Sequence, residues 1–218
     1  MENTIKKSWR DVTIDEYFDL KDRLDDVQEE TDKVVVKISF ANNISEEEVW
    51  DKTINEFRRL QVEALWMDEF NISEDIKFKN IEINGERYTV DVNLQNFTVA
   101  QYIDFQTFFP KRKTNERIIG NILACFIIPR EKKYASGYDI KKLVDDINSN
   151  LDILTANEIL LFFLKQYLIS IRATANYFNW IMKRMKRKSK NKMEIIKMEM
   201  EWNQIKETIL DGLRSLTV

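Results

Sequence analysis

The chain has 218 residues and a net charge of −3, a length that suits one large or two small domains with a buried core. Apolar residues make up 44% of it and aromatic residues 11%, with four glycines and two prolines. This composition excludes disordered, collagen-like and many-turned β-sandwich proteins and favours helices. Histidine is absent and Cys125 is the one cysteine, which excludes Ser-His-Asp and Cys-His catalysis, histidine metal centres and disulfide frameworks.

Helix starts are the clearest local signal. A Ser or Thr followed three residues later by Glu or Gln forms a capping box, in which each side chain accepts a hydrogen bond from the other residue's backbone N–H. Four such pairs precede apolar periodicity: Thr13/Glu16, Ser45/Glu48, Thr98/Gln101 and Thr155/Glu158. We predict a helix at each, including one over 45–67 that packs on a sheet through Val49, Trp50, Ile54, Phe57, Leu60 and Leu65.

Three segments are typical of strands. The segment 34–40 is rich in β-branched residues, which favours a strand. Apolar residues alternate through 76–83 and 87–92 on either side of Asn84 and Gly85, the dipeptide that best fits a type I′ hairpin turn. We therefore predict a small antiparallel sheet of these three segments, within an acidic α+β part that covers 1–97.

The rest of the chain has the pattern of helices. Segments 98–109 and 115–128 each end at a proline, and 139–147 is a short amphipathic segment. A helix over 155–185 would be about 45 Å long, and its apolar residues surround the helix, so most of its sides must be covered. The predicted fold class is α+β, predominantly α-helical, with the small antiparallel sheet followed by a helical body over 98–182 and a C-terminal heptad-like helix.

The last part, 183–218, differs in charge from the first. It opens with seven basic residues and no acidic one, namely Lys183, Arg184, Lys186, Arg187, Lys188, Lys190 and Lys192, whereas the first sixty residues hold sixteen acidic and ten basic residues. The basic run suits nucleic-acid phosphates, an acidic protein surface or an anionic membrane surface. Apolar residues then recur at the three- and four-residue spacing of a seam for a partner helix: Ile195, Met198, Trp202, Ile205, Ile209, Leu213 and Leu216.

The side chains that enzymes use are better explained here by structural roles. The four glycines are scattered, so no phosphate-binding loop is present. Glu131 and Lys133 resemble one end of a metal-dependent nuclease site, which needs a nearby acidic partner. Asp104 is the candidate, but it falls in a predicted helix while Glu131 falls in a loop. Cys125 lies in an apolar run and fits a buried position. We predict a non-enzymatic protein without catalytic residues, cofactors or metal ligands.

Membrane insertion and secretion are not indicated. The most apolar run, 159–164, is interrupted by Lys165 and Gln166, whereas a membrane-spanning helix needs about 20 apolar residues. The first twelve residues contain no apolar stretch of the kind that a secretion signal requires. We therefore expect a soluble cytosolic protein with no membrane span.

Three stretches resemble a known group of proteins. They are Trp-Arg-Asp-Val-Thr-Ile at 9–14, Phe-Thr-Val-Ala-Gln-Tyr-Ile-Asp-Phe-Gln at 97–106, and Asn-Ile-Leu-Ala-Cys-Phe-Ile-Ile-Pro at 121–129 with Tyr134 after it. Together they are similar to small proteins encoded among the structural genes of tailed bacteriophages of gut bacteria, crAss-like phages included. The likeness covers 9–163. It implies a virion component, such as a capsid, tail or packaged cargo protein, or alternatively a tail assembly chaperone, located in the virion and in the host cytoplasm during assembly.

Excess apolar surface indicates how the protein acts. A compact chain of this length has a radius of gyration of about 17 Å, which the two long helices exceed, so we expect a homo-oligomer or phage structural proteins to cover them. The predicted partner-binding residues are Leu161, Phe163, Tyr167, Tyr177, Trp180, Ile195, Met198, Trp202, Ile205 and Ile209. The basic run would contact an acidic partner or, in the alternative of a nucleic-acid-binding protein, phosphates.

Overall fold

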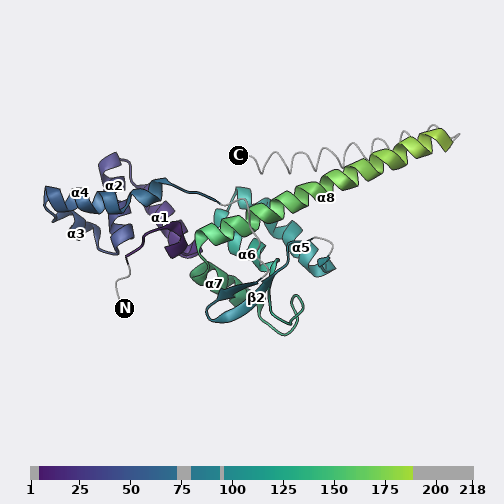
Figure 1. Ribbon diagram of the computed structural model, residues 1–218, viewed down its shortest axis with the longest axis horizontal. Coiled ribbons are helices and arrows are strands. Elements are labelled where there is room, and N and C mark those ends of the chain that lie inside the picture. The colour runs from purple at the N-terminus through teal and green to yellow at the C-terminus, as the bar shows by residue number, and fades with distance from the viewer. Residues whose placement is uncertain (1–4, 73–79, 94–95, 189–218) are drawn as a thin grey trace.

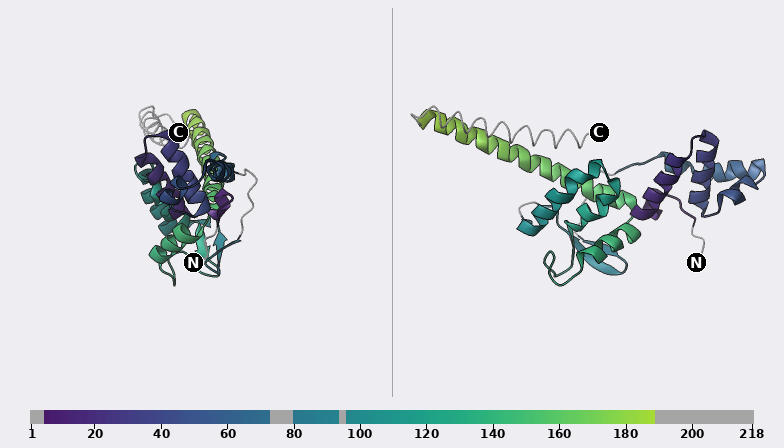
Figure 2. Two further views of the ribbon diagram at one scale, coloured as in Figure 1. Left: turned by 90° about the vertical axis from the view of Figure 1, so that its left-hand side faces the viewer. Right: turned by 180° about the vertical axis from the view of Figure 1, so that it is seen from behind.

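The computed structural model describes residues 5–72, 80–93 and 96–188 (Figure 1). These form an N-terminal lobe of helices, a C-terminal lobe of helices with a small sheet, and one long helix, α8 (Ile153–Lys188). Helix α8 begins where the two lobes meet, crosses the C-terminal lobe and continues beyond it, so the molecule is elongated (Figures 1 and 2). The fold is thus α+β and predominantly helical, as predicted.

The N-terminal lobe is all helical. Its elements are η1 (Trp9–Asp11), α1 (Ile14–Asp26), α2 (Glu30–Asn42), α3 (Glu46–Trp50), α4 (Ile54–Glu63) and η2 (Leu65–Asp68). Two of the predicted helix starts are confirmed here. Thr13 and Glu16 form a complete capping box before α1, and the Ser45 side chain accepts a hydrogen bond from the Glu48 backbone N–H at the start of α3.

The predicted strand over 34–40 is wrong, because this segment lies inside helix α2. Val35, Ile38 and Asn42 fall on one side of α2 and are buried. The spacing of three and four residues is that of a helix, and packing against α1, α3 and α4 outweighs the strand preference of β-branched residues. Asn43 ends the helix in the left-handed conformation with φ of 51°, a common way for a helix to stop.

The single helix predicted over 45–67 is also wrong, because the segment contains two helices and a 3₁₀ turn. Thr53 and Glu56 form a complete capping box, which starts α4 and separates it from α3. The break changes which side chains face inward. Val49 and Leu60 are buried as predicted, whereas Trp50, Ile54 and Leu65 are exposed, and no sheet lies beneath them.

The sheet belongs to the C-terminal lobe. Strands β1 (Asn80–Ile83) and β2 (Glu86–Val90) form the predicted hairpin, and both residues of its turn have positive φ, 51° at Asn84 and 76° at Gly85, as a type I′ turn requires. The third strand is β3 (Ile127–Pro129), which pairs antiparallel with β2. The strand order is therefore β1-β2-β3, and the third strand comes from the predicted helical body.

The remaining helices belong to the same lobe as this sheet, and they pack against one another. They are α5 (Val99–Phe108), η4 (Phe109–Lys113), η5 (Glu116–Ile118), α6 (Ile119–Ala124) and α7 (Ile140–Asn150). The capping box of Thr98 and Gln101 is confirmed, and Asp139 caps α7. The helix predicted over 115–128 ends at Ala124 instead, because the apolar residues after it form β3.

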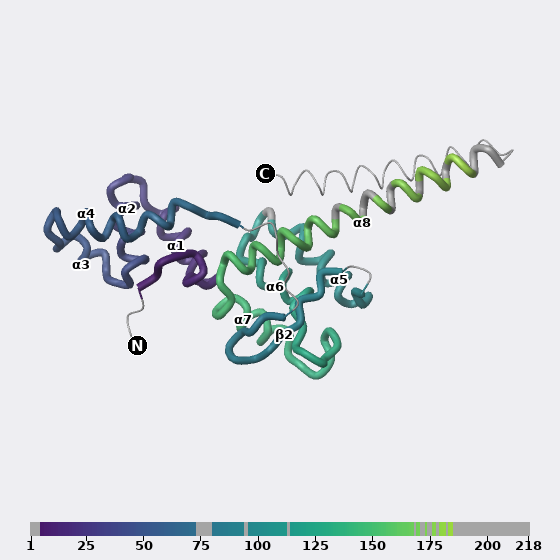
Figure 3. The backbone as a smooth tube through the Cα atoms, in the orientation of Figure 1, coloured from purple at the N-terminus to yellow at the C-terminus, as the bar shows by residue number. Residues whose placement is uncertain are grey.

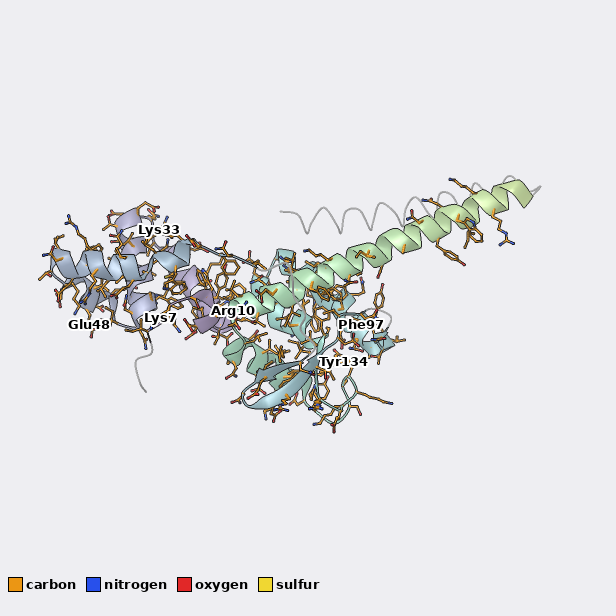
Figure 4. The ribbon with its side chains drawn as sticks, in the orientation of Figure 1. Lys7, Arg10, Lys33, Glu48, Phe97 and Tyr134 are labelled. Carbon is orange, nitrogen blue, oxygen red and sulfur yellow. The ribbon has the colours of Figure 1, made fainter. Side chains whose placement is uncertain are left out.

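An ion pair joins the two lobes at the start of α8. Arg10 of η1 donates one hydrogen bond to Thr155 Oγ1 at 2.8 Å and another to Glu158 Oε1 at 2.7 Å. Thr155 and Glu158 are therefore not the capping box that we predicted; the Asp152 side chain accepts from the Thr155 backbone N–H instead. Glu158 is 2% exposed, so Arg10 compensates a buried charge. Figure 4 shows Arg10 at this junction.

The core of the C-terminal lobe is a cluster of aromatic rings beneath the first half of α8. Phe163 of α8 stacks on Phe126 with ring centroids 4.1 Å apart and meets the edge of Phe105 at 4.8 Å. Phe97 and Tyr167 extend the cluster on either side. Pairs of this geometry stabilise a core beyond their buried area, so the first four turns of α8 are firmly held.

Candidate functional site

The candidate interaction surface is the part of α8 that continues past the folded body. Helix α8 has 36 residues, which corresponds to a length of about 54 Å. Its first part is buried in the lobe, and Tyr167 packs against the body through its contacts with Phe105 and Phe109. The tube in Figure 3 shows the helix continuing beyond the C-terminal lobe after this region. We call residues 168–188 the outer half of α8.

The outer half exposes large apolar side chains. Ile169, Tyr177 and Trp180 are 58%, 59% and 53% exposed. The Tyr177 and Trp180 rings are stacked with centroids 6.1 Å apart, and the Arg184 guanidinium lies 5.3 Å from the Trp180 ring centroid. This row of two rings and a cation follows one side of the helix at the spacing of successive turns. Exposed rings grouped in this way are typical of a contact surface.

The charge of α8 has one sign over most of its length. Between residues 159 and 188 the sequence contains seven basic residues and no acidic residue. Lys183 and Arg184 are exposed near the outer end. A helix that combines exposed rings with positive charge suits a partner that is both apolar and acidic.

The predicted partner-binding and basic residues lie in several different environments. Tyr177 and Trp180 are exposed on the outer half, while Leu161 and Tyr167 are half-buried. Phe163 is completely buried in the aromatic cluster, so its selection as a surface residue is wrong. Lys186, Arg187 and Lys188 belong to the last turn of α8. The others lie outside the described residues: Lys190, Lys192, Ile195, Met198, Trp202, Ile205 and Ile209.

Sequence reasoning missed a second exposed apolar surface, on the N-terminal lobe. Trp50, Ile54, Val62 and Leu65 are each more than half exposed, and we call them the α4 stripe. Leu60 of α4 and Ala64 directly after it are buried. The stripe runs from Trp50 at the end of α3 through Ile54 and Val62 of α4 to Leu65 of η2. The signal that could have revealed it is the capping box of Thr53, which shows that the helix starts again at this point.

A third exposed apolar group lies on α5. Val99, Tyr102 and Ile103 are exposed there at the spacing of one helix face. Gln106, one turn further along, donates a hydrogen bond to the Tyr167 hydroxyl at 3.4 Å, so this face of α5 lies beside α8 at the point where α8 leaves the body.

Titratable side chains meet where the loop after β3 packs against α5 and α6. The Tyr134 hydroxyl donates a hydrogen bond to Asp104 Oδ2 at 2.7 Å. Burial, followed by this hydrogen bond, raises the pKa of Tyr134, and burial raises the pKa of Cys125 to about 12. The Cys125 thiol is therefore protonated at neutral pH, and its buried position is confirmed. Figure 4 places Tyr134 beside the sheet, where it anchors the loop.

The described residues contain no group of three Cys, Asp or Glu side chains arranged to hold a metal ion. Asp104 accepts from Tyr134, whereas the Glu131 side chain is exposed and lies 3.9 Å from Arg130 Nε. Within the same ranges, no helix combines the length and apolarity needed to cross a membrane.

No known protein family, curated protein or solved structure matches the chain at a significant level. The surfaces described above are therefore the basis for assigning a function.

Proposed function

We propose that the chain is a non-enzymatic bacteriophage protein that acts through protein–protein contacts and is associated with the virion as a capsid or tail component or as packaged cargo. The observation that carries the proposal is the outer half of α8, on which Tyr177 and Trp180 stay more than half exposed. The resemblance of 9–163 to proteins of phage structural gene clusters supports the phage setting.

The energetic argument concerns the two rings. A tyrosine or tryptophan side chain buries about 150–250 Å² when it is fully covered, so covering the exposed halves of Tyr177 and Trp180 removes about 200 Å² from water. At about 25 cal/mol per Å² this contributes about 5 kcal/mol to association before the entropic cost of binding. A partner that covers the rings and matches the positive charge around them therefore gains enough to form a specific contact.

The test is incorporation into phage particles. Mass spectrometry of purified particles is expected to find the wild-type protein, and the double variant Tyr177→Ser/Trp180→Ser is expected to be lost from them. The matched control is Tyr102→Ser/Ile103→Ser, which removes a comparable exposed apolar pair from α5 and should be incorporated like wild type. Equal incorporation of both variants would show that the outer half of α8 is not the contact surface.

Absence of the wild-type protein from particles would contradict the virion role. An assembly chaperone makes a different prediction, because it acts before the particle is complete. In that case the wild-type protein is missing from particles, yet cells that carry the Tyr177→Ser/Trp180→Ser variant accumulate particles without normal tails.

A second candidate function is nucleic-acid binding, and the row formed by Tyr177, Trp180 and Arg184 favours it. Stacked rings beside cations are used by proteins that bind nucleic acids. If all seven cations of 183–192 contacted duplex phosphates, the slope of log K against log salt would be about −6. The variant Lys186→Gln/Arg187→Gln/Lys188→Gln keeps four of these cations, so the slope of log K against log salt should become less steep, about −4. Equal weak affinity of the two proteins would exclude this function.

A further inference from the structure

The N-terminal lobe and α8 carry opposite charge. Residues 5–72 hold eighteen acidic and ten basic residues, whereas α8 (Ile153–Lys188) holds one acidic and seven basic residues. The far side of the N-terminal lobe and the outer end of α8 are also the two extremes of the elongated molecule (Figures 1 and 2). A molecule with opposite charges at its two ends attracts the unlike end of another copy.

The α4 stripe supplies the apolar part of one end. Residues 44–70, which include the stripe, hold eight acidic and three basic side chains. Glu47, Glu48 and Asp51 are exposed beside Trp50, and among the described residues none of these three carboxylates forms an ion pair. Figure 4 shows Glu48 at the far side of this lobe. Arg58 lies within the stripe between Ile54 and Val62, where its aliphatic stem can cover apolar surface.

The outer half of α8 has the complementary chemistry at the other end. Ile169, Tyr177 and Trp180 provide apolar surface, and Lys183 and Arg184 provide positive charge. The lengths are comparable, since Ile54 to Leu65 covers about 17 Å along α4 and the start of η2, and Ile169 to Arg184 covers about 23 Å of α8. One helix can therefore lie along the other with apolar residues facing each other and opposite charges at the margins.

We propose that a second copy of the chain is the partner, with the outer half of α8 of one copy bound to the α4 stripe of the next. This inference rests on the proposed function, because it names one partner of the same α8 surface. The two surfaces lie at opposite ends of one molecule and cannot meet within it. The contact is therefore heterologous, because it joins two different surfaces. Each bound copy still has one of the two surfaces available for a further copy, so the copies form an open filament or a closed ring.

The contact is small for a protein interface, because one helix lies on another. Interfaces below about 1,200 Å² belong to the weak and transient class. We therefore expect self-association to become detectable at a protein concentration of about 100 μM and to increase at higher local concentration. Because the charges at its margin are exposed, the association should weaken as salt increases.

The test uses two variants of the full chain in sedimentation velocity experiments. The variant Ile54→Lys/Val62→Lys disables the α4 stripe, and the variant Trp180→Ser/Arg184→Glu disables the outer half of α8. Wild type is expected to form species that grow with concentration and shrink with salt, whereas each variant alone stays monomeric. A mixture of the two variants is expected to form dimers and nothing larger, because one intact stripe and one intact α8 remain to pair.

Two control variants match these changes at other exposed sites. Val99→Lys on α5 and Lys141→Glu on α7 should associate like wild type, and circular dichroism should show wild-type helix content for all variants. The inference is overturned if wild type is monomeric at every concentration, if either disabled variant still forms the large species, or if the mixture stays monomeric. Such a result leaves incorporation into particles unaffected, so it is distinguishable from a failure of the proposed function.

Discussion

Gly120 lies where α6 crosses α7, and its lack of a side chain allows the two helices to approach. A Cβ atom at this position would lie 2.1 Å from Asn148 Oδ1 and 2.8 Å from Asn148 Cγ. Distances this short mean that the Asn148 side chain or the helix itself must move. The glycine therefore leaves room for the Asn148 side chain against α6.

The first prediction concerns this contact. Gly120→Ala should lower the free energy of unfolding in urea by about 1–3 kcal/mol, as overpacking does in well-packed cores, although alanine favours a helix more than glycine does. The double variant Gly120→Ala/Asn148→Ala removes the clash and should recover most of the loss. A Gly120→Ala protein as stable as wild type would contradict the close approach.

A second residue-scale prediction concerns Cys125. Burial raises the pKa of its thiol to about 12, and the thiolate is the reactive form. At pH 8 the native protein should therefore react with a thiol reagent at least about 100-fold more slowly than the urea-unfolded protein, in which the pKa returns to about 8.5. The reaction is followed by absorbance of the released thiolate, and fast labelling of the native protein would show that Cys125 is accessible.

Single residues show what the apolar pattern of α8 could and could not predict. Tyr177 and Trp180 are exposed, and their role in binding a partner stays a prediction. Phe163 could not be separated from them, since apolar residues surround the helix and the pattern does not tell which side the aromatic cluster occupies. That information depends on the positions of Phe105 and Phe126, which are far apart in the sequence.

At the scale of elements, the helix starts were predicted well and the segments between them less well. Capping boxes are local, so Thr13 and Thr98 could be identified from the sequence and have the expected partners. The segment 34–40 was predicted as a strand because three consecutive valines favour that conformation. Its helix is fixed by packing against three other helices, which local preference does not include.

The third strand was missed for a related reason. The apolar run of 122–128 is continuous, and a continuous run fits a buried helix and a buried strand equally well. The structure divides it, with Ile122, Leu123 and Ala124 in α6 and Ile127 in β3. Residues 127–129 form a strand because they pair with the edge of β2. The position of that edge depends on the tertiary structure and could not be predicted from the local sequence.

The prediction at this scale concerns the start of α4. The Thr53 side chain accepts from the Glu56 backbone N–H, and Glu56 accepts from the Thr53 backbone N–H at 3.0 Å. Thr53→Ala should lower the free energy of unfolding by about 1 kcal/mol, the usual contribution of an N-cap, as measured by urea denaturation. Thr107→Ala is the control, because its hydroxyl bonds to the Ile103 carbonyl of its own helix, and its loss should change stability by less than about 0.5 kcal/mol.

At the scale of the whole molecule, the shape follows from α8. A compact chain of this length would have a radius of gyration of about 17 Å, while α8 alone extends about 54 Å and leaves the body after Tyr167. The sequence indicated this excess of helix over core, because its apolar residues continue well beyond the length that a small lobe covers. The charge contrast between the acidic first sixty residues and the basic run that begins at Lys183 was also visible in the sequence, but the placement of the N-terminal lobe and the outer half of α8 at opposite ends was not.

Small-angle X-ray scattering tests the shape. At low protein concentration and high salt, where association is weakest, the radius of gyration should clearly exceed the compact value of about 17 Å, and the distance distribution should have a long tail. The variant Trp180→Ser/Arg184→Glu should give the same monomer curve, because these side chains are exposed. A symmetric distribution with a compact radius would mean that α8 does not project.

The ion pair between Arg10 and Glu158 also has a consequence for folding during synthesis, because one partner is translated long before the other. A nascent chain of about 120 residues contains every helix of the N-terminal lobe but none of the residues that hold its first segment. In the complete chain the Ile14 backbone N–H donates to the Leu151 carbonyl, and the Ile153 backbone N–H donates to the Val12 carbonyl. The Arg10 side chain pairs with Glu158. Contacts between such distant positions are slow to form. A product truncated before residue 150 would leave Arg10 without its carboxylate partner Glu158, and it would be a ready target for cellular proteases.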